Sequence, residues 1–490
     1  MGEIRPGDDV VGIERVDCDV VVIGSGAGGA TAAYELSHAG LQVIVLEAGP
    51  HVRSQDFTQR ELDTVRRVYV DRGAQGPADG SLAILQGSCI GGSTIVNGEV
   101  CFRTPEPVLN EWARSHGVRG LGADELKPAF EDVERMIHVT VNDGRYLDSG
   151  LLASRGMKKL GIEPKPIARN VKDCRGCNYC FFGCAYGCKQ STDQSYVPAA
   201  MADGAKVICD ARVERIELDR GRATGVTART RHGTLEVRAR AVVVSCGAIQ
   251  TPLLLLDCGI GGSEVGKNLS VHPVVGPSGW FDPGEQPDDV SSLIGTYTDV
   301  FVGEGYLLEA YSGTPTFVAP FVPGFGREHK ELVRDLRQSA GVAAVVRDTG
   351  GFGRVRRGRR GEKVIEYAID AETRDKVRKS LRRVAEILFA AGARKVSMPF
   401  TVPLVLSSPD DLAKIDRQGY GPADIGFVSY HPQGTARLGA VTDSDGRVRD
   451  TRNVYVMDAS LFPTPVGVNP QVSIMGVTTV LARRLAAQLR

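Results

Sequence analysis

The chain lacks an excess of charge of either sign, and it lacks long apolar runs. Its 490 residues include 59 Lys and Arg against 59 Asp and Glu, so the formal net charge is zero. A balanced charge gives no electrostatic reason to bind nucleic acid or an anionic membrane, and we expect neither as a partner. No apolar stretch reaches the roughly 18 residues that a membrane-spanning helix requires, so we expect no membrane span.

Other features are missing as well. The first residues contain no apolar signal segment, which leads us to expect a cytoplasmic protein. Internal repeats, coiled-coil heptads and low-complexity tracts are absent from the sequence. A chain of this length is too long for a single core, so we expect two domains. The basic run 354–360 is expected to be a solvated loop.

A glycine motif near the N-terminus predicts a dinucleotide site. Residues 19–23 are apolar and rich in valine, as in a parallel strand buried on both faces. Gly24, Gly26 and Gly29 follow with G-x-G-x-x-G spacing. Gly24 permits the tight turn, Gly26 lets the backbone approach a pyrophosphate, and Gly29 lets the next helix pack close to the sheet.

The residues after this motif complete the predicted site. We expect a helix over 29–39, with its N-terminal amides directed at the phosphates, and a strand over 41–46. Glu47 ends that strand, where a carboxylate accepts hydrogen bonds from ribose hydroxyls. Ala27 and Ala48 are also expected to contact the dinucleotide. An acid at this place favours FAD or NAD over NADP, and this block alone leaves FAD and NAD open.

Further buried strands and helices are spread along the chain, so the dinucleotide domain is predicted to be discontinuous. A different pattern lies between them: 276–345 alternates like an antiparallel sheet, and 371–391 is an amphipathic helix. The strands expected in the dinucleotide domain are 206–209, 213–218, 225–228, 240–245 and 453–457, followed by a last helix over 470–489.

Four further motifs resemble those of the glucose–methanol–choline (GMC) oxidoreductase family, flavoenzymes that oxidise alcohols. Together with the N-terminal block they are spread over the chain, so the resemblance covers almost its whole length, and it decides for FAD. They are Gly87-Ser-Cys-Ile-Gly-Gly-Ser-Thr-Ile-Val-Asn97, Gly247-Ala-Ile-Gln-Thr-Pro252, His431-Pro-Gln-Gly-Thr435, and Asp458-Ala-Ser with Asn469-Pro-Gln-Val472.

The resemblance implies an α/β fold. A Rossmann-like FAD-binding domain of GMC type is expected over 15–105, 190–275 and 425–490. A cap or linker segment is expected over 106–189. An α+β substrate-binding domain, built on a mostly antiparallel sheet, is expected over 276–424.

The family motifs also imply which residues contact FAD. The loop residues are expected to run along the flavin, Val213 to contact the adenine, and the last helix to direct its amides at the flavin ring. The full set of implied FAD contacts is Gly24, Gly26, Ala27, Gly29, Glu47, Ala48, Gly87, Gly91, Gly92, Ser93, Asn97, Val213, Asp458, Ala459, Asn469, Pro470, Gln471 and Val472.

Two residues are implied to be catalytic. Oxidation of an alcohol by a flavin removes the hydroxyl proton and transfers a hydride to flavin N5, and a base accelerates the step. By resemblance His431 is the base, and Asn469, which cannot be a base, orients the substrate oxygen. His272 is expected to be a structural residue near a crossing between the domains.

Five of the 11 cysteines lie between positions 174 and 188. Cys174, Cys177, Cys180 and Cys184 have the C-x₂-C-x₂-C-x₃-C spacing of a ferredoxin-type run, with Cys188 as an alternative ligand. An iron–sulfur cluster, a zinc site and a loop without metal all stay open. A cluster would pass electrons from the flavin to another acceptor.

The expected function is FAD-dependent oxidation of a small-molecule alcohol to an aldehyde or ketone, as a dehydrogenase or an oxidase. Oxygen, a quinone or a redox protein is the acceptor. A sugar-like or glycosidic biosynthetic intermediate is one hypothesis for the substrate, and an apolar alcohol such as a steroid is also compatible. Two alternatives are a flavin/iron–sulfur electron-transfer protein and a non-oxidative family relative, such as a lyase.

Overall fold

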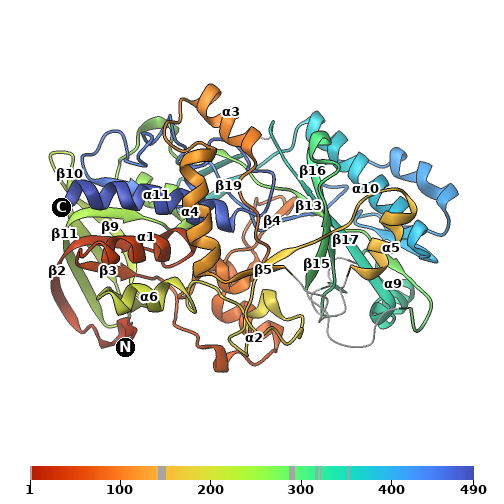
Figure 1. Ribbon diagram of the computed structural model, residues 1–490, viewed down its shortest axis with the longest axis horizontal. Helices are drawn as coiled ribbons and strands as arrows, with labels where there is room; N and C mark the ends of the chain where they lie inside the picture. Colours follow the sequence, from red (N-terminus) through yellow and green to blue (C-terminus); the bar gives the residue numbers. More distant parts are fainter. Residues whose placement is uncertain (1–2, 142–149, 286–292, 315–317, 320–321, 351–352) are drawn as a thin grey trace.

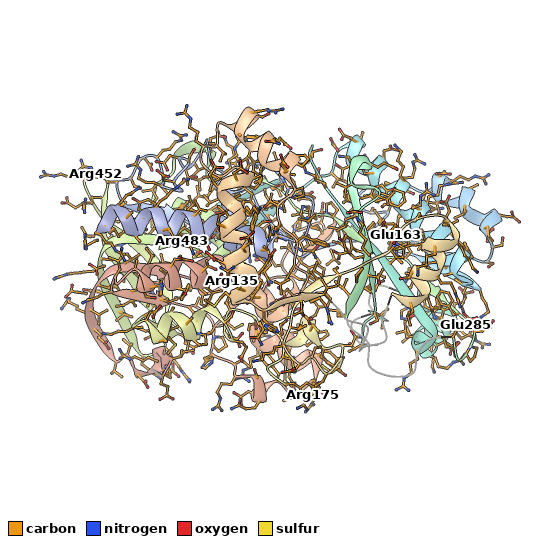
Figure 2. The ribbon with its side chains drawn as sticks, in the orientation of Figure 1. Arg135, Glu163, Arg175, Glu285, Arg452 and Arg483 are labelled. Carbon is orange, nitrogen blue, oxygen red and sulfur yellow. The ribbon has the colours of Figure 1, made fainter. Side chains whose placement is uncertain are left out.

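The computed structural model describes residues 3–141, 150–285, 293–314, 318–319, 322–350 and 353–490. It contains two large sheets that lie side by side along the long axis of the molecule (Figure 1). Both termini lie at the end that holds the first sheet. Charged side chains project from the surface of both halves, as the labelled Arg452 and Glu285 show (Figure 2).

The first sheet has eight strands among the described residues, in the order β1-β8-β3-β2-β11-β10-β9, with β23 paired to β11. Its centre is parallel and almost wholly buried, which explains the valine-rich sequences of these strands. The strands are β1 (Arg5–Pro6), β2 (Gly12–Ile23), β3 (Val43–Leu46), β8 (Lys206–Cys209), β9 (Arg212–Asp219), β10 (Arg222–Arg229), β11 (Gly233–Val244) and β23 (Val454–Val456).

Helices α1 (Ala27–His38) and α11 (Gln471–Leu489) pack against each other over this sheet. Figure 1 shows them in parallel, with α6 (Tyr196–Ala202) and α4 (Ala123–Met136) beside them. An ion pair from Arg483 of α11 to Glu35 of α1 and Asp132 of α4 joins three of these helices. The N-terminal ends of α1 and α11 therefore lie close to the same edge of the sheet.

Within the described ranges the second sheet has 10 strands, is mostly antiparallel and forms a core of its own. Helices α10 (Ala371–Ala391) and α5 (Leu151–Lys159) cover one face. Its strands are β4 (Leu82–Ile84), β6 (Lys165–Pro166), β13 (Val274–Val275), β14 (Ser278–Trp280), β15 (Ile294–Thr298), β16 (Tyr306–Tyr311), β17 (Ser339–Val346), β20 (Lys395–Met398), β21 (Leu404–Leu406) and β22 (Phe427–Ser429).

Smaller elements complete the fold. Strands β12 (Lys267–Leu269), β18 (Gly353–Arg357) and β19 (Lys363–Glu366) form a three-stranded sheet, and β5 (Val139–Val141) pairs with β7 (Ala168–Asn170). The prediction of a loop over the basic run was wrong for its first half, which is strand β18. The other α-helices in the part of the chain that the structure describes are α2 (Glu61–Val68), α3 (Glu106–His116), α7 (Gly247–Asp257) and α9 (Gly326–Arg334).

The predicted fold class is confirmed, with an FAD-type α/β unit and a second sheet. The residue boundaries of the domains stay a prediction. Strands β4 and β22 come from ranges predicted for the FAD-binding domain, and they pair in the second sheet. Among the described residues no helix is both long and apolar enough to cross a membrane.

Candidate active site

The turn between β2 and α1 shows why its glycines are required. Gly24 has a φ of 98°, in the left-handed region that favours glycine. A Cβ on Gly29 would lie 2.0 Å from the carbonyl oxygen of Gly24, which confirms that this residue lets the helix approach the sheet. A Cβ on Gly28 would lie 1.9 Å from the carbonyl oxygen of Met457. The G-x-G-x-x-G spacing gives no sign of this second close contact.

A cavity of about 840 Å³ opens at this edge of the first sheet, and its size suits a dinucleotide. Most of the predicted FAD contacts line it. Gly29 and Val472 are packed in the interior, and Gly91 forms a left-handed turn behind the cavity. The predicted residues that line it are Gly24, Gly26, Ala27, Glu47, Ala48, Gly87, Gly92, Ser93, Val213, Asp458, Ala459 and Pro470.

The polar groups of this cavity fit FAD. Neither α1 nor α11 has a side-chain cap at its N-terminus, so their first amides are available to an anion or to a polar edge of a ring. The Glu47 carboxylate is fixed by hydrogen bonds from the backbone and hydroxyl of Ser25, at 3.0 and 2.8 Å. Asp458 accepts from the amides of Gly247 and Ser460, both at 2.8 Å.

A second, smaller cavity of about 180 Å³ lies between the two sheets. Asn97, Asn469 and Gln471, predicted as FAD contacts, line this one instead of the larger cavity. Its wall is mostly apolar. The apolar side chains are Ala27, Val100, Phe181, Val274, Val275, Ile294, Ala343, Val345, Pro399, Val428, Tyr430, Pro470 and Ile474.

The two cavities share part of their walls. Ala27, Ser93, Tyr430, His431, Pro470 and Ile474 line both of them. These residues come from the glycine turn, the loop after β4, the segment after β22 and the start of α11. A ring bound at the end of the larger cavity would therefore face the smaller one beside His431.

His431 is buried and contacts another histidine. Its Nδ1 lies 3.0 Å from Nδ1 of His272. His272 is fully buried on the segment before β13, so the prediction that it is merely structural misses this contact with the catalytic candidate. Burial lowers the pKa of His431 to about 3 and that of His272 well below its ordinary value. Both rings are therefore neutral near pH 7.

Glu309 is the residue of the site that the sequence analysis missed. It lies on β16, its side chain is 3% exposed, and it lines the smaller cavity. Burial raises the pKa of Glu309 to about 7, and a hydrogen bond from the Asn469 side chain opposes this rise. A lone acid within the apolar sequence Tyr-Leu-Leu-Glu-Ala-Tyr was the available signal, because a buried strand rarely contains an unpaired carboxylate.

The cysteine-rich segment forms part of the cavity wall. Its Phe181 lines the smaller cavity and stacks on Tyr430, with ring centroids 5.0 Å apart. The ammonium group of the buried Lys189 donates to the carbonyl oxygens of Ile95, at 2.6 Å, and Cys180, at 2.7 Å. It also donates to Asn97 at 3.2 Å. This lysine thus ties the segment to the predicted flavin loop.

The same segment gives no support to a metal site. All five cysteines are free thiols that surround a small hollow beside the ion pair between Arg169 and Glu99. Throughout the described part of the chain, no three His, Cys, Asp or Glu side chains are arranged to hold a metal ion. The iron–sulfur and zinc interpretations of Cys174, Cys177, Cys180, Cys184 and Cys188 therefore remain without structural support.

Comparisons with known proteins agree with the site. Residues 64–274 and 354–478 match two models described as GMC oxidoreductase, and residues 19–58 match an FAD-binding domain. An uncharacterized GMC-type oxidoreductase of Mycobacterium tuberculosis is 36% identical, over 96% of this chain and 76% of its own length. A long-chain-alcohol oxidase of Arabidopsis thaliana is 28% identical, over 99% of this chain and 69% of its own.

A solved structure shows the same fold. Pyridoxine 4-oxidase from Mesorbium loti superposes with a TM-score of 0.73 over 95% of this chain and 99% of its own, at 18% sequence identity. The sequence prediction of an FAD-dependent oxidoreductase is therefore confirmed at the level of the family. The chain belongs to the GMC oxidoreductase family.

Proposed function

We propose that this protein oxidises the CH–OH group of an alcohol with an apolar carbon skeleton, with FAD in the larger cavity and the alcohol in the smaller one. The observation that carries this proposal is the wall that the two cavities share. His431 and Pro470 belong to both, so a hydroxyl group beside His431 lies next to the N-terminus of α11.

The residues have separable tasks in this reaction. FAD supplies, when bound, an acceptor for a hydride and its two electrons. His431 and Asn469 would hold the hydroxyl oxygen and orient the carbon that loses the hydride. The uncapped amides of α11 would favour negative charge on a ring bound beside them. The apolar wall excludes water from the reacting atoms.

The cavity lining supports an apolar substrate. Most of the exposed wall of the cavity is apolar, so a carbon chain gains free energy on entry while most hydroxyls of a sugar would lose hydrogen bonds to water. The names of two similar proteins, a long-chain-alcohol oxidase and pyridoxine 4-oxidase, favour alcohol oxidation. The sugar-like substrate stays a prediction without support from this lining.

Anaerobic mixing with alcohols tests the proposal. We expect 1-octanol to bleach the flavin absorbance of the wild-type protein, and the rate to fall roughly 100-fold or more in His431→Ala. Glu366→Gln, at the exposed last residue of strand β19, is the control and should bleach at the wild-type rate. A flavin that no alcohol of a broad panel reduces would reject the function. Oxygen, a quinone and a dye, added after reduction, identify the class of acceptor.

A further inference from the structure

The position of the proton on His272 follows from its surroundings. The backbone N–H of Gly467 donates to its Nε2 at 2.9 Å. The orientation of the Gln433 side chain is set by its Oε1, which accepts from the amide of Val466 at 3.2 Å. Its NH₂ group therefore faces His272 and lies 3.4 Å from Nε2 of that ring. Two donors converge on Nε2, which must therefore carry the lone pair. A neutral His272 then has its proton on Nδ1.

This arrangement determines the proton on His431 as well. The Nδ1–H of His272 points at Nδ1 of His431, 3.0 Å away. Nδ1 of His431 must accept this hydrogen bond, because two N–H groups at that distance would repel each other. A neutral His431 therefore carries its proton on Nε2. It can donate a hydrogen bond to an alcohol oxygen, but it has no free lone pair with which to remove the proton.

Glu309 has the free lone pairs that His431 lacks. Its Oε1 is buried and contacts no hydrogen-bond donor within the described ranges, and Asn469 Oδ1 is likewise without a partner. Both residues line the smaller cavity together with His431. The pKa of the Glu309 carboxyl group is raised by burial and lowered by the Asn469 hydrogen bond, and no neighbouring cation among the described residues contributes to it.

We propose that Glu309 is the base that accepts the hydroxyl proton, and that His431 is a hydrogen-bond donor whose tautomer is set by His272. This proposal rests on the proposed function. In the step, the O–H bond of the alcohol breaks and its proton forms an O–H bond with the Glu309 carboxylate. The C–H bond breaks with its electron pair, which leaves as a hydride to FAD, and the C=O bond forms. His272 is a positioning residue.

The remaining titratable groups around Glu309 do not compete for this task. Glu99 lines the cavity but is paired with Arg169. Burial raises the pKa of Tyr311 and Tyr430, which also line it, so both phenols stay protonated. On β15, Tyr297 stands opposite Glu309, and burial raises its pKa too. On the other neighbouring strand, β17, the opposite residue is Ala343.

Crossed kinetics of two variants test the assignment. In Glu309→Gln we expect anaerobic flavin reduction to slow by roughly 100- to 10,000-fold, and the rise of the wild-type rate near pH 7 to disappear. In His431→Gln, which retains an N–H donor, that ionisation should persist. Glu304→Gln, outside the cavity on the same hairpin, is the matched control. Loss of the ionisation in His431→Gln with its retention in Glu309→Gln would overturn the proposal.

Two measurements without substrate separate this proposal from the function itself. In ¹⁵N-histidine NMR spectra, the resting holoprotein should show His431 protonated at Nε2 and His272 at Nδ1. A spectrum with the His431 proton on Nδ1 would reject the tautomer. In wild type and Glu309→Gln, infrared difference spectra should assign a carboxyl group titrating near pH 7 to Glu309. If these results hold and no alcohol reduces the flavin, the proposed function fails while the proton assignment stands.

Thermal stability supplies a third readout. The pKa of Glu309 in the folded state, about 7, lies above its ordinary value of 4.5, so folding favours the protonated form. The stability that this form contributes is present below about pH 4.5 and is lost as the pH rises through about 7. Glu309→Gln should therefore raise the Tm at pH 8 relative to wild type and change it little at pH 5. Equal shifts at both pH values would contradict an ionising Glu309.

Discussion

The two sheets contribute to the site in different ways. The parallel sheet presents backbone: glycine turns and the open amides of two helix N-termini line the larger cavity. The antiparallel sheet presents side chains, among them Glu309 from β16 and Ala343 from β17. Backbone groups in the larger cavity can bind the cofactor whatever the substrate is, but their geometry tolerates few substitutions. Side chains in the smaller cavity determine which substrate binds and which groups react with it. Substitutions around the larger cavity should therefore affect folding and FAD binding, whereas substitutions around the smaller cavity should affect the reaction with the substrate.

The largest effect is expected at the start of α1, where this helix packs against the parallel sheet. Gly29→Ala would place a Cβ 2.0 Å from the carbonyl oxygen of Gly24, and the helix cannot move away without opening the core. We expect loss of soluble flavoprotein, measured by yield and by Tm. In Gly26→Ala the new Cβ meets its nearest neighbour at 3.8 Å, so this variant should fold and lose bound FAD. Gly303→Ala, where the space is open, is the control.

An intermediate effect is expected where the cysteine-rich segment contacts the flavin loop. Lys189→Met removes the donor shared by three backbone carbonyls and should lower the free energy of unfolding by about 2–5 kcal/mol. Denaturant unfolding measures this change, and the fraction of bound flavin should fall with it. Lys172→Met, on the exposed side of the segment, should change neither value. If Lys189→Met left both the free energy of unfolding and the bound flavin unchanged, the contact between the segment and the flavin loop would not stabilise the site.

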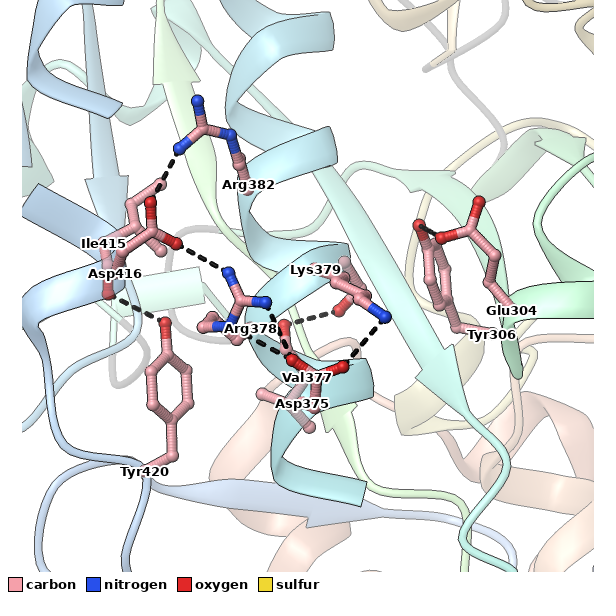
Figure 3. Close-up of polar contacts among 11 residues, drawn as sticks. Glu304, Tyr306, Asp375, Val377, Arg378, Lys379, Arg382, Ile415, Asp416 and Tyr420 are labelled. Carbon is pink, nitrogen blue, oxygen red and sulfur yellow. Dashed lines mark hydrogen bonds and ion pairs between the residues drawn. The ribbon is translucent and has the colours of Figure 1, made fainter. Parts of the chain in front are cut away.

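The smallest effect is expected on the outer face of α10. Figure 3 shows Asp416 between Arg378 and Arg382, with N–O distances of 2.7 and 2.8 Å. Because all three side chains are partly exposed, Asp416→Asn should cost less than about 1 kcal/mol and leave flavin reduction unchanged. Thermal unfolding at low and high salt measures the cost. A slower reduction would show that this distant face does affect the site.

Sequence patterns predicted the regular elements and the backbone site well. The strand predicted over 206–209 is β8, and the helix predicted over 371–391 is α10. The strand predicted over 41–46 begins later, at Val43. Buried parallel strands, glycine turns and amphipathic helices are local patterns, so a single segment suffices to identify them.

The side-chain site could not be predicted in the same way. The smaller cavity takes much of its wall from strands β13, β15, β16, β17 and β22, and none of these strands has a motif of its own. The contact between His272 and His431 joins residues 159 positions apart. The spacing of the five cysteines left a metal site open, whereas in the fold Phe181 lines the cavity and Lys189 binds the backbone of the predicted flavin loop.

The most direct test of an apolar cavity beside FAD is the rate of anaerobic flavin reduction by a series of 1-alcohols from butanol to dodecanol. Each methylene group that enters the cavity should contribute about 0.8 kcal/mol, so the second-order rate constant should rise roughly fourfold per methylene until the cavity is full. Ala343→Phe, which narrows the cavity, should end this rise at a shorter chain. A rate independent of chain length, or faster reduction by polyols, would contradict the account.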